Sequence, residues 1–335
     1  MFSGAELEKG LLVHAGALRW NFFRIVPGKA GEGKLITQAA MKAEMEKRLP
    51  RIRKMAAWEK AYAEKMRSAA AADEPVNDFS SLRPLANGPV SLNVVQVRGK
   101  DQLRITLPSG TILLDPALGG AVTSLKIGGK ELVREPGFGT SGFWTPRKAA
   151  HNIVKGFKLV GVKKIGRDGI EIELHRIVSE FERAPLAGVR IVRRLLFTPG
   201  SLTIGSRLEN TAVSPRRFAF RFHTMPAHLA GPDGRAEFGG TGFDRGQGLK
   251  ICRFGIPEKE IDTAWRAKLI NVEGPAFTLR KPGLPDLTVT PGGAPVYGVI
   301  FWDTGTSSTA EPVFRTLTLA PGTAQEFTMK VQWQK

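Results

Sequence analysis

Hydrophobic and polar residues alternate in many short stretches between residues 90 and 335. From Ile191 to His228 three such stretches follow one another, with turns at Pro199 and around Pro215. Alternation with a period of two is typical of a β-strand that buries one face. Roughly a dozen such stretches, each bounded by Gly, Pro, Asn or Asp, predict an all-β protein. The expected fold class is mainly β, a large antiparallel β-sandwich.

A different pattern fills residues 36–72, which are rich in Ala, Glu, Lys, Met and Arg. Apolar residues recur there at spacings of three and four, from Met41 to Met66, as they do on one face of an amphipathic helix. Pro50 divides this segment into two helices or bends a single one. The predicted organisation is a helical N-terminal segment over residues 1–72, a linker over 73–89 and the β-sandwich domain over 90–335.

Composition excludes several classes of protein. The 335 residues are 42% hydrophobic and 24% charged, as in an ordinary globular protein. The only cysteine, Cys252, excludes an intramolecular disulfide and a cysteine-based metal site. No apolar run is long enough for a transmembrane helix, and the N-terminus lacks the pattern of a secretory signal peptide. We therefore expect no membrane partner, no metal, no cofactor and, by default, a cytoplasmic location.

The net charge of +18 is concentrated in the β-rich part. Residues 1–80 hold 14 Lys and Arg against 10 Asp and Glu, which leaves 35 against 21 for the remainder. The basic residues occur as pairs, such as Lys163-Lys164 and Arg193-Arg194, and not in the longer blocks that are typical of nucleic-acid arms. No nucleic-acid partner is expected. The charge indicates either a solvated basic surface or attraction of anionic ligands such as uronic acids, sulfated sugars or phosphates.

The third of the alternating stretches suggests a ligand site. Phe218, Phe220 and Phe222 fall on one face of the predicted strand, and Arg221 and His223 fall on the other. The aromatic face is expected to lie in the core. The opposite face then becomes a candidate floor for a polar ligand, where Arg221 would orient an anionic sugar through paired N–H donors.

Three segments, in this order, resemble the galactose mutarotase-like (aldose 1-epimerase) superfamily of large β-sandwiches. Residues 107–133 resemble its first hairpins, and residues 208–223 its strand that ends in Asn-Thr before a proline-bearing turn and a histidine strand. Residues 310–333 resemble its closing strands. The resemblance covers roughly residues 90–335 and implies a curved sheet that binds sugar on its concave face.

The resemblance also implies residue roles. In the epimerases of the family a glutamate removes a proton from the anomeric hydroxyl, a histidine delivers one to the ring oxygen, and a second histidine supports it. It implies Glu311 as the base, with Asp303 as a competing position, His223 as the acid and His151 as the supporting histidine. The sequence departs from the family where Asn152 follows His151 and Thr-Met-Pro follows His223. These departures weaken the case for mutarotase activity and leave the fold unaffected.

Two tryptophans, Trp144 and Trp302, stand at predicted strand ends or in loops. An exposed indole can stack on the C–H face of a sugar while its N–H binds a hydroxyl, and packing in the core is the alternative for each.

The leading hypothesis is a divergent mutarotase-like domain that binds or processes a mono- or oligosaccharide, with an anionic sugar as one option, and that is accessory to polysaccharide or glycoside breakdown. The alternatives are a hexose or hexose-phosphate 1-epimerase and a non-catalytic interaction module. Residues 36–72 would then contact an upstream catalytic domain or a partner chain.

Overall fold

The computed structural model describes most of the chain from residue 75 to residue 334, and the chain divides into two compact units, residues 1–72 and 73–335. The gaps are residues 145–149, 154, 180–183, 231–232, 239–240, 245–249, 254–267, 272–273 and 304–307. Of the strand residues 136, 144, 150–153, 241–244, 250–253, 268–271 and 302–303, only the backbone is described. The predicted N-terminal helical segment lies outside the described residues, apart from isolated positions between 46 and 64, and stays a prediction.

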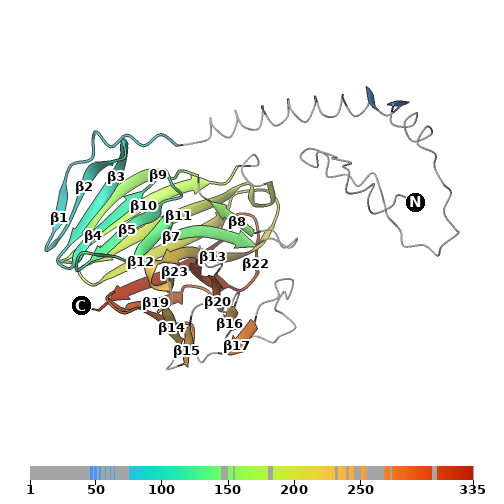
Figure 1. Ribbon diagram of the computed structural model, residues 1–335. Helices are drawn as coiled ribbons and strands as arrows, with labels where there is room; N and C mark the ends of the chain where they lie inside the picture. The colour runs from blue at the N-terminus through green and yellow to red at the C-terminus, as the bar shows by residue number, and fades with distance from the viewer. Residues whose placement is uncertain are drawn as a thin grey trace. The chain divides into compact units, whose positions relative to one another are not determined.

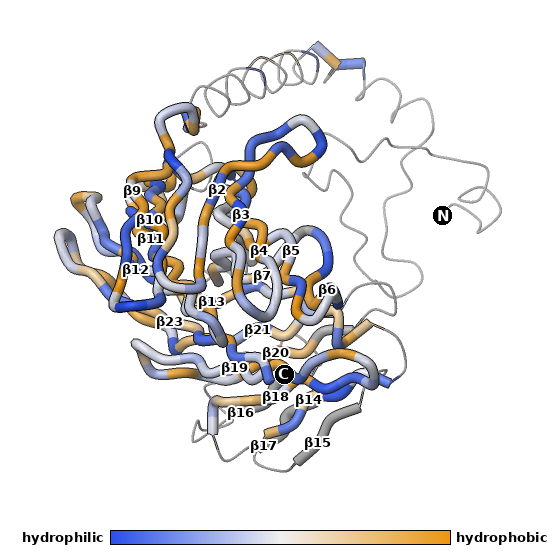
Figure 2. The backbone as a smooth tube through the Cα atoms, turned by 90° about the vertical axis from the view of Figure 1, so that its left-hand side faces the viewer, coloured by the Kyte–Doolittle hydropathy of each residue, from blue (hydrophilic) through white to orange (hydrophobic). Residues whose placement is uncertain are grey.

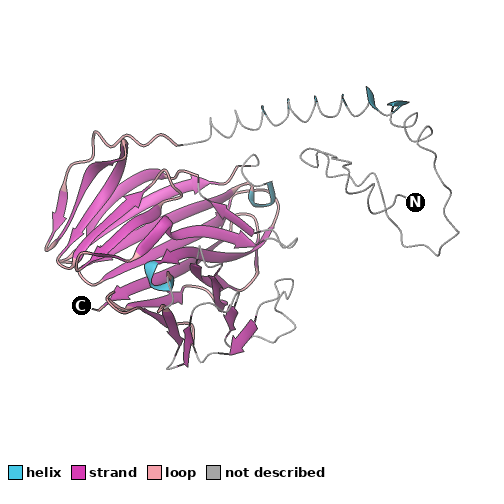
Figure 3. Cartoon of the chain, in the orientation of Figure 1, coloured by secondary structure: helices cyan, strands magenta, loops and turns pink. Residues whose placement is uncertain are grey.

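Two large β-sheets make up the second unit (Figures 1 and 3), which confirms the prediction of a mainly β, antiparallel fold. The first sheet runs in the order β1 (Leu85–Asn87), β2 (Val90–Val97), β3 (Lys100–Leu107), β4 (Gly110–Asp115), β5 (Ala121–Ile127), β7 (Val133–Trp144), β13 (Arg216–Pro226), β21 (Ser308–Phe314), β20 (Val296–Asp303), β16 (Lys250–Arg253) and β17 (Lys268–Asn271). The short strands β6 (Lys130–Glu131), β8 (Ala150–Ile153) and β22 (Leu317–Leu319) pair with β5, β7 and β13. Among the described pairings only β16 with β17 is parallel.

In the described part of the chain, the second sheet has nine strands. Its order is β15 (Thr241–Asp244), β14 (Arg235–Phe238), β18 (Phe277–Arg280), β19 (Leu287–Gly292), β23 (Ala324–Trp333), β12 (Ser201–Asn210), β11 (Val189–Thr198), β10 (Gly169–Ile177) and β9 (Lys158–Ile165). Two short 3-10 helices, η1 (Ala184–Leu186) and η2 (Ala227–Leu229), lie in connections between strands. The predicted linker over 73–89 includes strand β1, which pairs with β2.

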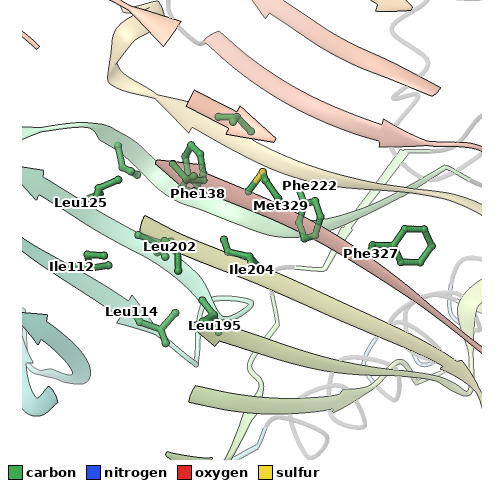
Figure 4. Close-up of a cluster of buried hydrophobic side chains, with 14 of the residues drawn as sticks. Ile112, Leu114, Leu125, Phe138, Leu195, Leu202, Ile204, Phe222, Phe327 and Met329 are labelled. Atoms are coloured by element: carbon green, nitrogen blue, oxygen red, sulfur yellow. The ribbon is translucent and has the colours of Figure 1, made fainter. Parts of the chain in front are cut away.

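The core lies between the two sheets. Figure 4 shows Leu125 and Phe138 of the first sheet beside Leu202, Ile204 and Met329 of the second, and all five are buried. Hydrophobic and hydrophilic residues alternate along the strands in Figure 2, as they must when each strand turns one face to the core. Burial of these apolar faces is the main force that holds the sheets together.

One basic residue lies in this core. Arg193 of β11 is fully buried, because its position continues the alternation of Ile191, Leu195 and Phe197. The interpretation of the Arg193-Arg194 pair as solvated surface is therefore wrong for Arg193. The strand's period of two decides which face the side chain takes, and here it overrides the preference of a charge for water.

The rotation of β13 is fixed by an aromatic cluster. The ring of Phe220 packs against those of Phe143, Phe222, Phe314 and Phe327, with centroids 4.7 to 6.1 Å apart. Edge-to-face and offset pairs at these distances are favourable. Since these rings lie between the sheets, the residues that alternate with them on β13 face the other side of the first sheet.

Strand β9 forms one edge of the second sheet, and two asparagines from the segment before β2 bind at this edge. The Asn77 amide donates to the Phe157 carbonyl at 2.8 Å, and its oxygen accepts from the Leu159 N–H at 2.7 Å. At the other end of the strand, Asn87 donates to the Gly169 carbonyl at 2.7 Å. The segment that precedes β2 is therefore bound to the β unit by side-chain hydrogen bonds.

Candidate functional site

Three of the predicted site residues come together on the first sheet. Arg221 and His223 lie on β13, on the face opposite the phenylalanines, and Glu311 lies on the adjacent strand β21. Arg221 of β13 pairs with Val313 of β21. Glu311 is two residues before Val313, so its side chain lies on the same face of the sheet as that of Val313. We call these three residues the Arg221 cluster.

The carboxylate of Glu311 lies between the two basic side chains. Arg221 donates a hydrogen bond from Nη1 to Oε2 of Glu311, and Nε2 of His223 lies 3.6 Å from Oε1. The Glu311 side chain is 1% exposed, and that of His223 is 15% exposed. A buried carboxylate needs a partner of opposite charge or several hydrogen-bond donors, and a guanidinium supplies both.

Burial also sets the protonation of His223. Desolvation lowers the pKa of its imidazole below 6.5; Glu311 opposes this shift, and Arg221 adds to it. A neutral imidazole carries one N–H donor and one nitrogen acceptor. At neutral pH the cluster therefore presents a cation, an anion and a neutral group with both hydrogen-bonding functions.

The structure adds one residue that the sequence analysis missed. Thr309 precedes Glu311 by two positions on β21 and therefore shares its face. It is 5% exposed, and its Oγ1 atom has no hydrogen-bond partner in the part of the chain that the structure describes. A buried hydroxyl without a partner is unusual. The period of two from Glu311 was the signal that could have found it.

Trp144 lies in β7, the strand next to β13, and His151 lies in β8, one strand further away. His151 is in β8, where its backbone pairs with Phe143 of β7, and the backbone of Trp144 pairs with Ala219 of β13. Ala219 precedes Arg221 by two positions on the same face. The side chains of His151 and Trp144 lie outside the described residues, so their roles stay predictions.

Trp302 and Asp303 form the end of β20, on the other side of β21. Their backbones pair with Thr309 and Ser308. Ile300, two positions earlier than Trp302, pairs with Glu311. The side chains of Trp302 and Asp303 also lie outside the described residues, and stacking by Trp302 and a polar role for Asp303 stay predictions.

Within the described ranges, no three His, Cys, Asp or Glu side chains gather in a way that could hold a metal ion. The same ranges contain no helix that is both long and apolar enough to cross a membrane.

Comparisons with known proteins give matches among solved structures alone. No family model matches the chain, and no curated protein does. A galactose mutarotase-like protein from Clostridium acetobutylicum is 10% identical over 74% of this chain and 99% of its own, with a TM-score of 0.48. Another from Lactobacillus casei is 13% identical over 72% and 100%, with a TM-score of 0.43. The 4-alpha-glucanotransferase from Thermococcus litoralis is 10% identical over 75% of this chain and 40% of its own, with a TM-score of 0.44. Two of these three structures, those from Clostridium acetobutylicum and Lactobacillus casei, are named galactose mutarotase-like.

Proposed function

We propose that this chain is a divergent mutarotase-like domain that binds or processes carbohydrate, and that the Arg221 cluster is its site. The observation that carries the proposal is the meeting of Arg221, His223 and Glu311 on one sheet face, opposite the aromatic core. A buried group of this composition is costly to maintain for stability alone, because each charge loses its hydration.

The cluster has the donors and acceptors that a sugar requires. Each sugar hydroxyl donates one hydrogen bond and accepts others, so its binding site needs both functions at close range. Glu311 accepts, Arg221 donates, and neutral His223 does both. The hydroxyl of Thr309, on the same face and without a partner in the described ranges, supplies a further donor and acceptor. We propose that these four side chains bind the sugar.

A 1-epimerase of hexoses or hexose phosphates is the second candidate, because His223 and Glu311 are adjacent. Ring opening removes a proton from the anomeric hydroxyl and delivers one to the ring oxygen. Oε1 of Glu311 would take the first proton, and Nε2 of His223, 3.6 Å away, would deliver the second. Delivery requires protonated His223, and the lowered pKa makes that form scarce at neutral pH. We therefore place binding ahead of epimerisation and favour a role accessory to polysaccharide or glycoside breakdown.

The test combines a sugar panel with an exchange measurement. Binding of neutral mono- and oligosaccharides is measured by calorimetry for the wild type, Glu311→Gln and His223→Ala. We expect at least one neutral sugar to bind and each substitution to weaken it about tenfold or more, which corresponds to about 1.4 kcal/mol. Glu326→Gln, on strand β23 of the other sheet, is the matched control and is expected to bind as the wild type does.

The same proteins are then assayed for anomer exchange by NMR. Exchange that is catalysed by the wild type and abolished by Glu311→Gln would move the epimerase to first place. If no neutral sugar binds and no exchange occurs, the proposal is wrong, and a non-catalytic interaction module becomes the better account.

A further inference from the structure

A second pocket lies on the other sheet, at the edge of β9 and β10. Strand β9 begins at Lys158, which pairs with His175, whereas β10 continues to Ile177. The last two residues of β10 therefore extend beyond the edge strand and leave a notch. A pocket of about 450 Å³ opens there, within the range of ligand sites. We call it the β10 notch; its lining is Pro75, Lys158, His175, Arg176, Ile177 and Arg190.

The notch is basic. Of the six lining residues in the described part of the chain, three are Lys or Arg, one is His and none is acidic. Lys158 makes no ion pair with the described residues. The carboxylate paired with Arg190 is that of Glu209, 3.7 Å away, and Glu209 also lies 3.3 Å from Arg207. Within the described residues, the charges of Lys158 and Arg190 are therefore only partly neutralised.

The same sheet face is neutralised outside the notch. Lys163 pairs with Glu171 and Arg194 with Glu173, each at 2.8 Å. His175 also contacts Glu173 at 2.8 Å, from the edge of the notch. Cations and anions thus alternate in cross-strand pairs over the face, as expected for a solvated sheet. In the notch this pairing is incomplete, and the incompletely paired cations Lys158 and Arg190 line the pocket.

The notch offers two kinds of wall. Arg176 is 5% exposed and is held by a hydrogen bond from Nη1 to the Gly156 carbonyl at 2.7 Å, so its guanidinium has a fixed place. Ile177 is 49% exposed, and it forms an apolar wall with Pro75. Guanidinium groups bind carboxylate and sulfate oxygens through directed N–H donors, and an apolar wall suits the C–H face of a sugar ring.

We propose that the β10 notch binds an acidic sugar residue, either a uronate or a sulfated sugar. Lys158, Arg176 and Arg190 hold the oxyanion, and Ile177 with Pro75 contacts the ring. The inference goes beyond the proposed function, because the notch shares no residue or sheet with the Arg221 cluster. It also assigns a ligand-binding role to part of the chain's net positive charge.

The test uses a uronate trisaccharide, its neutral counterpart and the full chain. Calorimetric affinity is compared between the wild type and the double variant Lys158→Gln/Arg190→Gln. The control is Lys163→Gln/Arg194→Gln, which removes the same charge from the same sheet face outside the notch. We expect the acidic trisaccharide to bind the wild type and the control alike, and the notch variant at least tenfold more weakly. Binding should also weaken as salt is added.

Three results would overturn the inference. One is equal affinity of the notch variant and the wild type, and another is equal affinity for the neutral trisaccharide. The third is full competition by an RNA oligonucleotide of the same charge, which would identify a general polyanion surface. All substituted residues are on the surface, so a thermal melt that matches the wild type verifies the fold. The neutral-sugar panel tests the Arg221 cluster separately, so either proposal can fail alone.

Discussion

Two buried arginines occupy different regions of this molecule and are held in different ways. Arg193 lies in the core between the sheets, where Nη1 donates to the carbonyls of Gly119 and Gly120 at 2.9 and 3.1 Å. Its Nη2 donates to Oγ of Ser141 at 2.6 Å. Arg221 lies on the opposite side of the first sheet and donates to the carboxylate of Glu311.

The difference separates a structural cation from a candidate functional one. The hydrogen-bond partners of Arg193 among the described residues are neutral, so burial lowers its pKa to about 9, and its bonds connect one sheet to the other. Arg221 is balanced by a carboxylate that also faces a histidine, on a sheet face where the Thr309 hydroxyl has no partner among the described residues. Burial of a charge is therefore weak evidence for function by itself. The chemistry of its partners is the better guide.

Arg193→Ala tests the structural half of the comparison and should have the largest effect. The substitution leaves two carbonyls and a hydroxyl unsatisfied and opens a cavity between the sheets. We expect the free energy of unfolding to fall by about 3–5 kcal/mol, measured by urea denaturation.

Arg194→Ala is the matched control for that experiment. Arg194 is the next residue, on the exposed face of β11, where it pairs with Glu173. Its loss should cost no more than about 1 kcal/mol, as for other surface ion pairs. Equal losses for Arg193→Ala and Arg194→Ala would contradict the account of Arg193 as a connection between the sheets.

A double-mutant cycle on Arg221 and Glu311 tests the other half and should give the next largest effect. Glu311→Gln leaves a buried guanidinium without its counter-charge, and Arg221→Met leaves a buried carboxylate. Each is expected to destabilise the fold, whereas the double variant recovers part of the loss. The coupling free energy from urea denaturation should be about 1–3 kcal/mol. Additive effects would show that the pair is not coupled in solution.

The pH dependence of stability sharpens the role of His223 and should show the smallest effect. Because burial lowers the folded-state pKa below 6.5, the unfolded chain takes up a proton first as the pH falls. The free energy of unfolding should therefore decrease as the pH drops through about 6.5 toward the folded-state pKa, and this contribution should be absent well above 6.5. His223→Asn should remove this part of the decrease.

The comparison is made by urea denaturation of both proteins over the same pH series. Burial also lowers the pKa of His228, which is present in both proteins, so its contribution cancels in the difference. Parallel curves for wild type and His223→Asn would mean that His223 has an ordinary pKa in the folded chain.

The sequence predicted which face of β13 carries Arg221 and His223, but not that β21 is the adjacent strand. The alternation of Phe218, Phe220 and Phe222 with polar residues was enough to place Arg221 and His223 opposite the core. The contact of Arg221 with Glu311 joins residues 90 positions apart, and it depends on the pairing of β13 with β21. Local patterns carry no information about such long-range strand order, and only the family resemblance suggested that Glu311 belongs to the site.

The burial of Arg193 was predictable in principle. It occupies a core position in the period of Ile191 and Leu195, but its charge favoured a surface assignment. Thr309 could not be singled out from the sequence either, because threonine is common in strands. Only the structure shows that its hydroxyl is buried and has no partner among the described residues. Patterns of hydrophobicity predict the fold well, whereas polar residues that break the pattern are seen only in three dimensions.

The two asparagines at the edge of the second sheet bear on whether strands of other molecules can add to this edge. An open edge strand presents N–H and C=O groups to which a strand of another molecule can add, and this is a common route to aggregation. The amide of Asn77 makes both of the bonds that such a strand would make at Phe157 and Leu159. A fragment that begins at Val90 would lack this cover. Expression designs for the β unit should therefore begin upstream of Asn77.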